Sequence, residues 1–267
     1  METIELESWE DFVSAVPDMQ RDQKSLEDLA GPLPPALFRG HASESWRLQT
    51  TLERKVGSAQ SLQDYHQRVY DSKHQMEAYS GNKWHVPNPN DFGKILKHGA
   101  GLADRMPALD YLVYLRHHGF PSPLLDWTRS PFVAAYFAFS GVQKMEDRVS
   151  IYALTSAART MQTHGAPSAV VKSLGFRIRT HKRHFLQQCE YTICMQIGAH
   201  GRWVYGDHEQ VLNSSSQQGL HLRKYILPAA ERSTALRYLD MFNLNAYTLF
   251  GSEDSLVESV GRRVLGY

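Results

Sequence analysis

The chain has 267 residues, of which 42% are hydrophobic, and its 29 basic residues nearly balance its 28 acidic ones. This length is sufficient for a sizeable core and predicts one large domain, with or without an insertion. The net charge of +1 gives no sign of the strongly basic surface that DNA- and RNA-binding domains present.

Signals for membrane insertion and secretion are absent from the sequence. It has no apolar run of roughly 18 residues, the length that marks a transmembrane helix, and its N-terminus is acidic rather than basic and then apolar. Cys189 and Cys194 occupy one predicted strand, where roughly 16 Å would separate them, too far for a disulfide. We expect a cytoplasmic protein without a membrane partner, in a reducing compartment.

The first forty residues predict two strands and one helix between them. We expect a strand over 3–7, a helix that Ser8 caps and that ends near Ala15, and a buried strand over 36–40. Arg39 needs a partner in that apolar strand, because an unpaired buried guanidinium is very costly. An internal salt bridge would provide one, and so would the carboxylate or phosphate of a ligand.

Residues 55–105 have a weaker hydrophobic pattern than their flanks and predict a helical insertion. Within this stretch, residues 58–80 are helix-prone, and residues 82–93 form a loop rich in Asn and Pro. An amphipathic helix over 108–118 then returns the chain to the core.

The central stretch is a polar, proline-containing loop over 117–131 that opens an apolar helix over 132–139. Either Thr128 or Ser130 can act as N-cap, and Pro131 suits the first helical position. Large apolar side chains point in nearly all directions around the helix, which predicts that it is buried. Its N-terminus would attract a phosphate or a similar anion, although capping alone accounts for the same residues.

The last part of the chain alternates between strands and helices. A connection over 155–175 precedes the one basic run, 177–184, and such runs are more often solvated faces than binding sites. In the predicted strand 185–195, Gln188 and Glu190 lie on the same face, and an inward-facing glutamate is rarely passive. The other predicted elements are strands over 149–154 and 220–227, a helix over 233–241 and a final helix from residue 252 or 254 to 263.

Taken in order, these segments resemble the FRG domain family, named for its Phe/Tyr-Arg-Gly signature. The resemblance spans about residues 32–260 and implies a single domain that occupies the chain, 1–267, in a bacterial or phage protein. It departs from the family pattern at Cys189 and Glu190, where a glycine and an apolar residue are usual. The matching motifs are Phe38-Arg39-Gly40, Trp46-Arg47-Leu48, His118-Gly119, Leu124-Leu125-Asp126-Trp127-Thr128, Ser130-Pro131, Ala134-Ala135-Tyr136-Phe137-Ala138, Tyr191-Thr192 and Thr248-Leu249-Phe250.

The order of polar segments is also similar to that of the Arg–Ser–Glu class of ADP-ribosyltransferases. This resemblance implies an α+β fold with a mixed or antiparallel split sheet, and NAD as the substrate. It places Arg39 on a phosphate and a ribose of NAD, with Thr128 and Ser130 shaping the site. Glu190 is then the catalytic carboxylate, assisted by Gln188, because cleaving the nicotinamide glycosidic bond builds an oxocarbenium ion that a carboxylate stabilises.

Further residues are assigned to this NAD site by the family signature or by their chemistry. The signature gathers Gly40, His118 and Asp126, and an aromatic side chain such as Trp127 or Tyr136 would face the nicotinamide ring. We expect no metal. The acceptor of ADP-ribose, whether protein, nucleic acid, small molecule or water, is not indicated, and the family's distribution fits a toxin or phage-defence setting.

Two other functions fit the same residues. A metal-dependent nuclease would hold Mg²⁺ or Mn²⁺ with Asp126, Glu190 and His118, although no spacing such as His-Glu-x-x-His occurs. A non-catalytic sensing or binding module would instead use Arg39, Asp126 and Thr128 as a structural hydrogen-bonded network.

Overall fold

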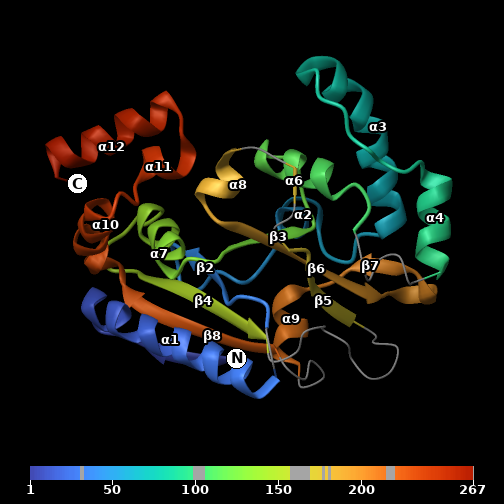
Figure 1. Ribbon diagram of the computed structural model, residues 1–267. Coiled ribbons are helices and arrows are strands. Elements are labelled where there is room, and N and C mark those ends of the chain that lie inside the picture. Colours follow the sequence, from blue (N-terminus) through green and yellow to red (C-terminus); the bar gives the residue numbers. More distant parts are fainter. Residues whose placement is uncertain are drawn as a thin grey trace.

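The computed structural model describes residues 1–30, 33–98, 106–156, 169–175, 178–179, 182–214 and 220–266. At its centre lies one eight-stranded sheet in the order β1-β8-β4-β2-β3-β6-β5, with β7 paired to β6 (Figure 1). Strands β1 and β8 are parallel and the other pairs are antiparallel, so the predicted mixed sheet is confirmed. The strands are β1 (Glu2–Glu5), β2 (Leu37–His41), β3 (Leu124–Thr128), β4 (Arg148–Ser156), β5 (Ala169–Ser173), β6 (Cys189–Ile197), β7 (Trp203–Tyr205) and β8 (Leu220–Pro228).

Helices pack on the sheet and extend beyond it at both ends. Figure 1 shows α3 and α4 at one end of the molecule and α10, α11 and α12 at the opposite end. The helices are α1 (Trp9–Ala30), α2 (Thr51–Val56), α3 (Leu62–Ser80), α4 (Pro89–His98), α6 (Leu109–His117), α7 (Pro131–Ser140), α8 (Lys182–Leu186), α9 (His208–Asn213), α10 (Arg232–Met241), α11 (Ala246–Phe250) and α12 (Glu253–Leu265), with short 3₁₀ turns at Ala199–Gly201 and Ala229–Glu231.

Helix α7 is buried against β2, as its apolar sequence predicts. Ser130 is its N-cap and accepts a hydrogen bond from the Val133 amide at 3.3 Å, and Pro131 begins the helix. Gly40 allows β2 to pack closely against α7, because a Cβ at this position would lie 1.9 Å from the carbonyl oxygen of Ala134 in that helix. The glycine of the Phe-Arg-Gly signature therefore has a packing role.

Three predicted boundaries are wrong. Helix α1 continues to Ala30 rather than ending near Ala15, with Pro17 inside it. The stretch 82–93 is not all loop, because α4 begins at Pro89, a residue that suits the first turn of a helix. The strand predicted from residue 185 begins only at Cys189, because the preceding residues form α8.

Strand β5 lies within the stretch 155–175, which the sequence suggests is only a connection, and pairs with β6 along its length. Residues 157–168 of that stretch, and residues 177, 180 and 181 of the basic run, lie outside the described residues. Cys189 and Cys194 are free, buried thiols, as expected. In the part of the chain that the structure describes, no helix has the length and apolar character to cross a membrane.

Candidate functional site

The centre of the candidate site is a gap in the sheet between β2 and β3. Phe38 pairs with Thr128, and beyond this pair β2 continues along β4 while β3 continues along β6. The two strands separate there, and the side chains of Arg39 and Asp126 fill the opening between them. Polar groups at a sheet opening can reach both each other and a ligand.

Two arginines converge on the carboxylate of Asp126. Arg39 Nη1 donates to Asp126 Oδ1 at 2.9 Å and to the Asp126 carbonyl oxygen at 2.6 Å. Arg116, on α6, also pairs with Oδ1 and donates through Nη1 to Thr51 Oγ1 at 2.9 Å. The Asp126 side chain is 41% exposed, whereas the two arginine side chains are 14% and 12% exposed. The Asp126 side chain is therefore more accessible to a ligand than the two arginines are.

Positively charged side chains outnumber negatively charged ones at this gap. Burial opposes ionisation of Asp126, but the guanidiniums of Arg116 and Arg39 outweigh it and hold the pKa of that carboxyl well below its usual range. Burial and the nearness of Arg39 and Arg116 lower the pKa of Arg54. Arg39 and Arg116 thus contact one carboxylate, Arg54 lies near enough to interact with both arginines, and Glu53 offsets part of the charge of Arg54. The positive charge that remains favours an anionic ligand.

His41 supports Arg39 from the same strand. Its Nε2 accepts a hydrogen bond from Arg39 Nε at 2.9 Å, and its Nδ1 lies 3.3 Å from the carbonyl oxygen of Trp46. Burial and the charge of Arg39 lower the pKa of His41 to about 3, so the ring is neutral at pH 7. A neutral acceptor fixes the orientation of the guanidinium without competing with a ligand's negative charge.

A cavity of about 230 Å³ lies beside this cluster. It is large enough for one ring or one phosphate group rather than for a whole dinucleotide, so a larger ligand would extend out over Asp126. Its lining residues include predicted site residues and new ones: Arg39, Gly40, Asp126, Trp127 and Thr128, together with Trp46, Phe137, Gln187 and Cys189.

Glu190 lies on the same face of the sheet as Arg39. Glu190 on β6 pairs with Trp127 on β3, so these two side chains lie on one face. Arg39 on β2 pairs with Tyr152 on β4, and Tyr152 packs in the same apolar cluster as Trp127, so Arg39 lies on that face too. Two strand spacings, on the order of 10 Å, separate the backbones of β2 and β6. The carboxylate is 4% exposed and accepts a hydrogen bond from Arg129 Nε at 2.6 Å.

Gln188 does not share a strand face with Glu190, and that expectation is wrong. The residue precedes β6, is exposed and has a φ of +49°, because the chain turns there at the end of α8. Gln187 is the buried member of the pair. It lines the cavity and donates through Nε2 to the Leu249 carbonyl oxygen at 3.0 Å.

Thr128, Ser130 and Trp127 have structural partners at the site. Thr128 Oγ1 donates to the Gln187 carbonyl oxygen at 2.7 Å and accepts from the Ser130 amide at 3.1 Å. Trp127 is buried, and its indole nitrogen donates to Thr192 Oγ1 at 2.9 Å. These bonds hold β3, α8 and β6 together and so fix the walls of the cavity.

Tyr136 and His118 lie elsewhere. Tyr136 lines a separate cavity beside α10 and α12. His118 follows α6, where its ring centroid is 4.4 Å from that of Tyr114. Neither residue lines the cavity beside Arg39 among the described residues.

Residues 34–147 match the family model of the FRG domain. Over this segment the chain is similar to the FRG domain family. The matched segment contains the whole Arg39–Asp126–Arg116 cluster, whereas Glu190 lies beyond its C-terminal end. No curated protein and no solved structure matches the chain significantly.

The three side chains considered as metal ligands have separate partners in the structure. Asp126 pairs with arginines, Glu190 pairs with Arg129 and His118 packs against Tyr114. Among the described residues, no group of three or more His, Cys, Asp or Glu side chains is positioned to hold a metal ion.

Sequence reasoning missed two residues of the cluster. Arg116 has no motif of its own and reaches Asp126 only because α6 packs beside β3. His41 follows the signature directly, and its position two residues after Arg39 on a strand could have placed both on one face.

Proposed function

We propose that this protein binds NAD at the gap between β2 and β3 and transfers ADP-ribose from it. The observation that carries the proposal is the placement of Arg39, Trp127 and Glu190 on one face of three neighbouring strands, with Asp126 and Arg116 meeting Arg39 through the gap from the opposite face. A phosphate-binding arginine and a carboxylate are the two groups that this reaction needs.

The guanidinium groups would bind the pyrophosphate. Arg39 donates through Nε to His41 and through Nη1 to Asp126, so its guanidinium is oriented before a ligand arrives, and its Nη2 is left to bind a phosphate oxygen. Arg54 and Arg116 add positive charge at the same opening. Asp126 and Glu53 offset part of this charge, and the positive charge that remains favours binding of a pyrophosphate.

Glu190 would stabilise the positive charge that develops on the ribose. The bond from ribose C1′ to the nicotinamide nitrogen breaks, its electron pair leaves with nicotinamide, and the acceptor's nucleophile forms the new bond to C1′ while losing its proton. Arg129 orients the carboxylate through a 2.6 Å hydrogen bond. Because Glu190 is 4% exposed, the ribose reaches it only if side chains around Arg129 move.

We extend the proposal to the setting that the family resemblance implies, a bacterial cytoplasm and a toxin or phage-defence system. The acceptor would be a macromolecule.

The burial of Glu190 behind Arg129 favours one second candidate, a binding module without catalysis. In that case the Arg39–Asp126–Arg116 cluster binds an anionic ligand, and Glu190 has only a structural role as the ion-pair partner of Arg129.

Nicotinamide release from NAD distinguishes the two candidates. We expect the purified protein, alone or with cell lysate, to release nicotinamide, and the folded Glu190→Gln and Arg39→Ala variants to lose that release. Dependence on lysate would identify a macromolecular acceptor. If the wild type neither releases nicotinamide nor changes its melting temperature with NAD, the transferase proposal fails; if NAD raises the melting temperature without release, the binding module is correct.

A further inference from the structure

Helix α12 is amphipathic, but its polar side faces the protein. Ser255 and Ser259 are buried, and the Arg262 side chain is only 16% exposed. Ser259 Oγ accepts a hydrogen bond from the Tyr247 amide of α11 at 3.0 Å, and Ser255 Oγ accepts one from the Ser252 amide at 3.0 Å. The side of α12 that packs on the chain is therefore lined by hydrogen-bonding groups.

The apolar side chains of α12 lie on its other side. Val257, Val260 and Val264 follow one another at a spacing of three and four residues, which places them on one side of the helix with Leu256 at the edge. The three valines are 66%, 45% and 75% exposed, and Leu256 is 41% exposed. These four residues, which we call the α12 stripe, form a pattern that a helix normally buries. An outward-facing stripe of this kind marks an interaction surface.

Two further exposed apolar residues flank the α12 stripe. Leu265, in the last turn of α12, is 74% exposed, and Met241, at the end of α10, is 76% exposed. Met241 lines one cavity together with Arg262 and Arg263, so it lies beside the last turns of α12. Figure 1 shows α10, α11 and α12 together at one end of the molecule, opposite α3 and α4. The apolar surface therefore extends from α12 onto α10.

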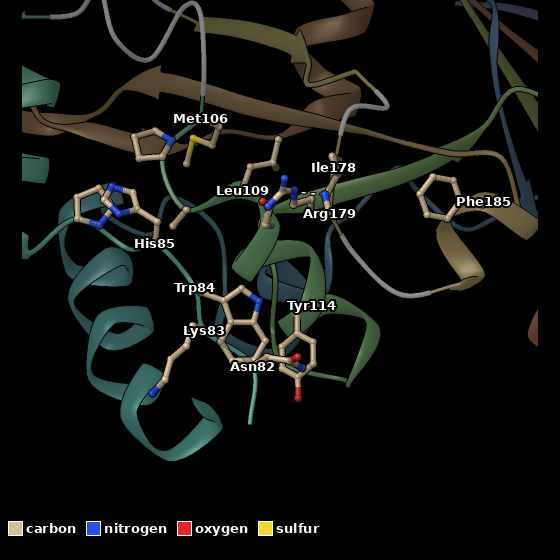
Figure 2. A pocket seen from close by; sticks show the side chains of 14 residues that line it. Asn82, Lys83, Trp84, His85, Met106, Leu109, Tyr114, Ile178, Arg179 and Phe185 are labelled. Atoms are coloured by element: carbon tan, nitrogen blue, oxygen red, sulfur yellow. Dashed lines mark hydrogen bonds between the residues drawn. The ribbon is translucent and has the colours of Figure 1, made fainter. Parts of the chain in front are cut away.

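A larger cavity on the other side of the molecule differs from this surface, because its groups have partners within the chain. It has a volume of about 1120 Å³ and lies between the segment after α3, the start of α6 and residues 178–185 (Figure 2). Lys83 pairs there with Glu77 at 3.4 Å, and the rings of Trp84 and Tyr114 pack together with centroids 4.5 Å apart. This cavity gives no comparable sign of a partner.

The two ends of the α12 stripe differ in charge. Glu253 and Asp254 are exposed at its N-terminal end, and Arg183 of α8, which lies over the Phe250 ring, offsets at most one of them. At the C-terminal end Arg263 donates to Asp240 through Nε and Nη2 and remains 51% exposed. Arginines outnumber carboxylates by one at that end, which contains Arg237, Arg262 and Arg263 with Asp240 and Glu258. A net charge of opposite sign thus remains at each end.

We propose that the α12 stripe binds the α12 stripe of a second copy of this chain, with the two helices antiparallel about a two-fold axis at Val260. Leu256 of each copy then lies opposite Val264 of the other, and the acidic end of each helix lies beside the basic end of the other. A parallel copy would place like charges side by side, and the acidic end would be repelled by an anionic membrane surface. This proposal concerns assembly alone and holds whether or not the chain acts on NAD.

The exposed apolar area is sufficient for a weak dimer. Complete burial of one Val, Leu or Met side chain removes roughly 100 Å² of apolar surface. With the exposures given above, the α12 stripe, Leu265 and Met241 offer about 400 Å² per copy. Since homodimer interfaces are about 65% apolar, this area fits an interface of about 1,200 Å² in total, the lower end of the range for specific complexes. We therefore expect a dissociation constant in the micromolar range.

Sedimentation velocity of the purified protein from about 1 to 100 µM tests the proposal. We expect the mass to rise from that of a monomer to that of a dimer over this range. Val260→Glu should weaken dimerisation by about tenfold or more, because it brings two carboxylates together on the two-fold axis. Val56→Glu is the matched control, since Val56 on α2 is 44% exposed and Val260 is 45% exposed. It should dimerise as the wild type does, and unfolding curves show whether each variant is folded.

Single cysteines test the orientation of the two helices, because both native thiols are buried. Val260→Cys should give a disulfide-linked dimer under oxidised glutathione, whereas Val264→Cys should not, since roughly 12 Å of helix separates its two copies. A wild type that stays monomeric at about 100 µM, whether or not it binds phosphatidylcholine vesicles, overturns the proposal. So does an equal loss of dimer in Val56→Glu and Val260→Glu, or equal cross-linking of the two cysteine variants.

Discussion

Replacing Gly40 with alanine tests the reason for the glycine in the Phe-Arg-Gly signature. The added Cβ would lie 1.9 Å from the Ala134 carbonyl oxygen and 2.7 Å from the Ala138 amide nitrogen. Both neighbours are backbone atoms of α7, so no side chain can rotate away. The helix and β2 would have to separate by more than an ångström, and we expect Gly40→Ala to lower the free energy of unfolding by about 3 kcal/mol.

Urea denaturation of the wild type and variant measures this loss. Gly93→Ala is the matched control, because its Cβ would meet only the flexible Gln63 side chain, 3.2 Å away. That change lies inside α4 and should leave stability unchanged or raise it by up to about 1 kcal/mol, since alanine favours helix. A Gly40→Ala protein as stable as the wild type would refute the close packing of β2 on α7.

Other predictions concern capping and pH. Ser130→Ala removes the cap of α7 and should cost about 1 kcal/mol in urea denaturation, whereas a Ser130→Asp variant, which caps as well, should keep wild-type stability. Burial lowers the pKa of His41 to about 3 and that of His208 to about 4, so both rings are protonated in the unfolded chain before the folded one. Stability should therefore be full above about pH 6.5 and fall by about 1 kcal/mol per pH unit for each histidine as the pH drops toward 4. Between pH 7 and pH 4.5 the urea midpoint should decrease less in His208→Leu than in the wild type. An equal decrease in the two proteins would show that His208 does not contribute to the pH dependence of stability.

Local sequence patterns were sufficient where one element satisfies its own requirements. The α7 helix was predictable because Ser130, Pro131 and the surrounding apolar residues act within a single turn or along a single helix. The capped start of α12 was predictable for the same reason, since Ser252 bonds to the Ser255 amide.

Elements that depend on distant partners were not predictable in this way. The polar sequence after Ala15 stays helical in α1, and β5 is a strand because it pairs with β6. At the site, the strand order places Arg39, Trp127 and Glu190 on three neighbouring strands. The pairing of Arg116 with Asp126 and of Arg129 with Glu190 depends on packing that no single segment encodes.

The NAD-induced change in melting temperature tests the central claim most directly, because it reports binding at the Arg39 cluster whatever the acceptor is. Saturating NAD should raise the melting temperature of the wild type and of Glu190→Gln by several degrees. Arg39→Lys keeps the charge but loses the planar guanidinium that donates to His41, Asp126 and the ligand at once, so the folded variant should show little or no shift. No shift in the wild type, or an equal shift in folded Arg39→Lys, would contradict the assignment of NAD to this site.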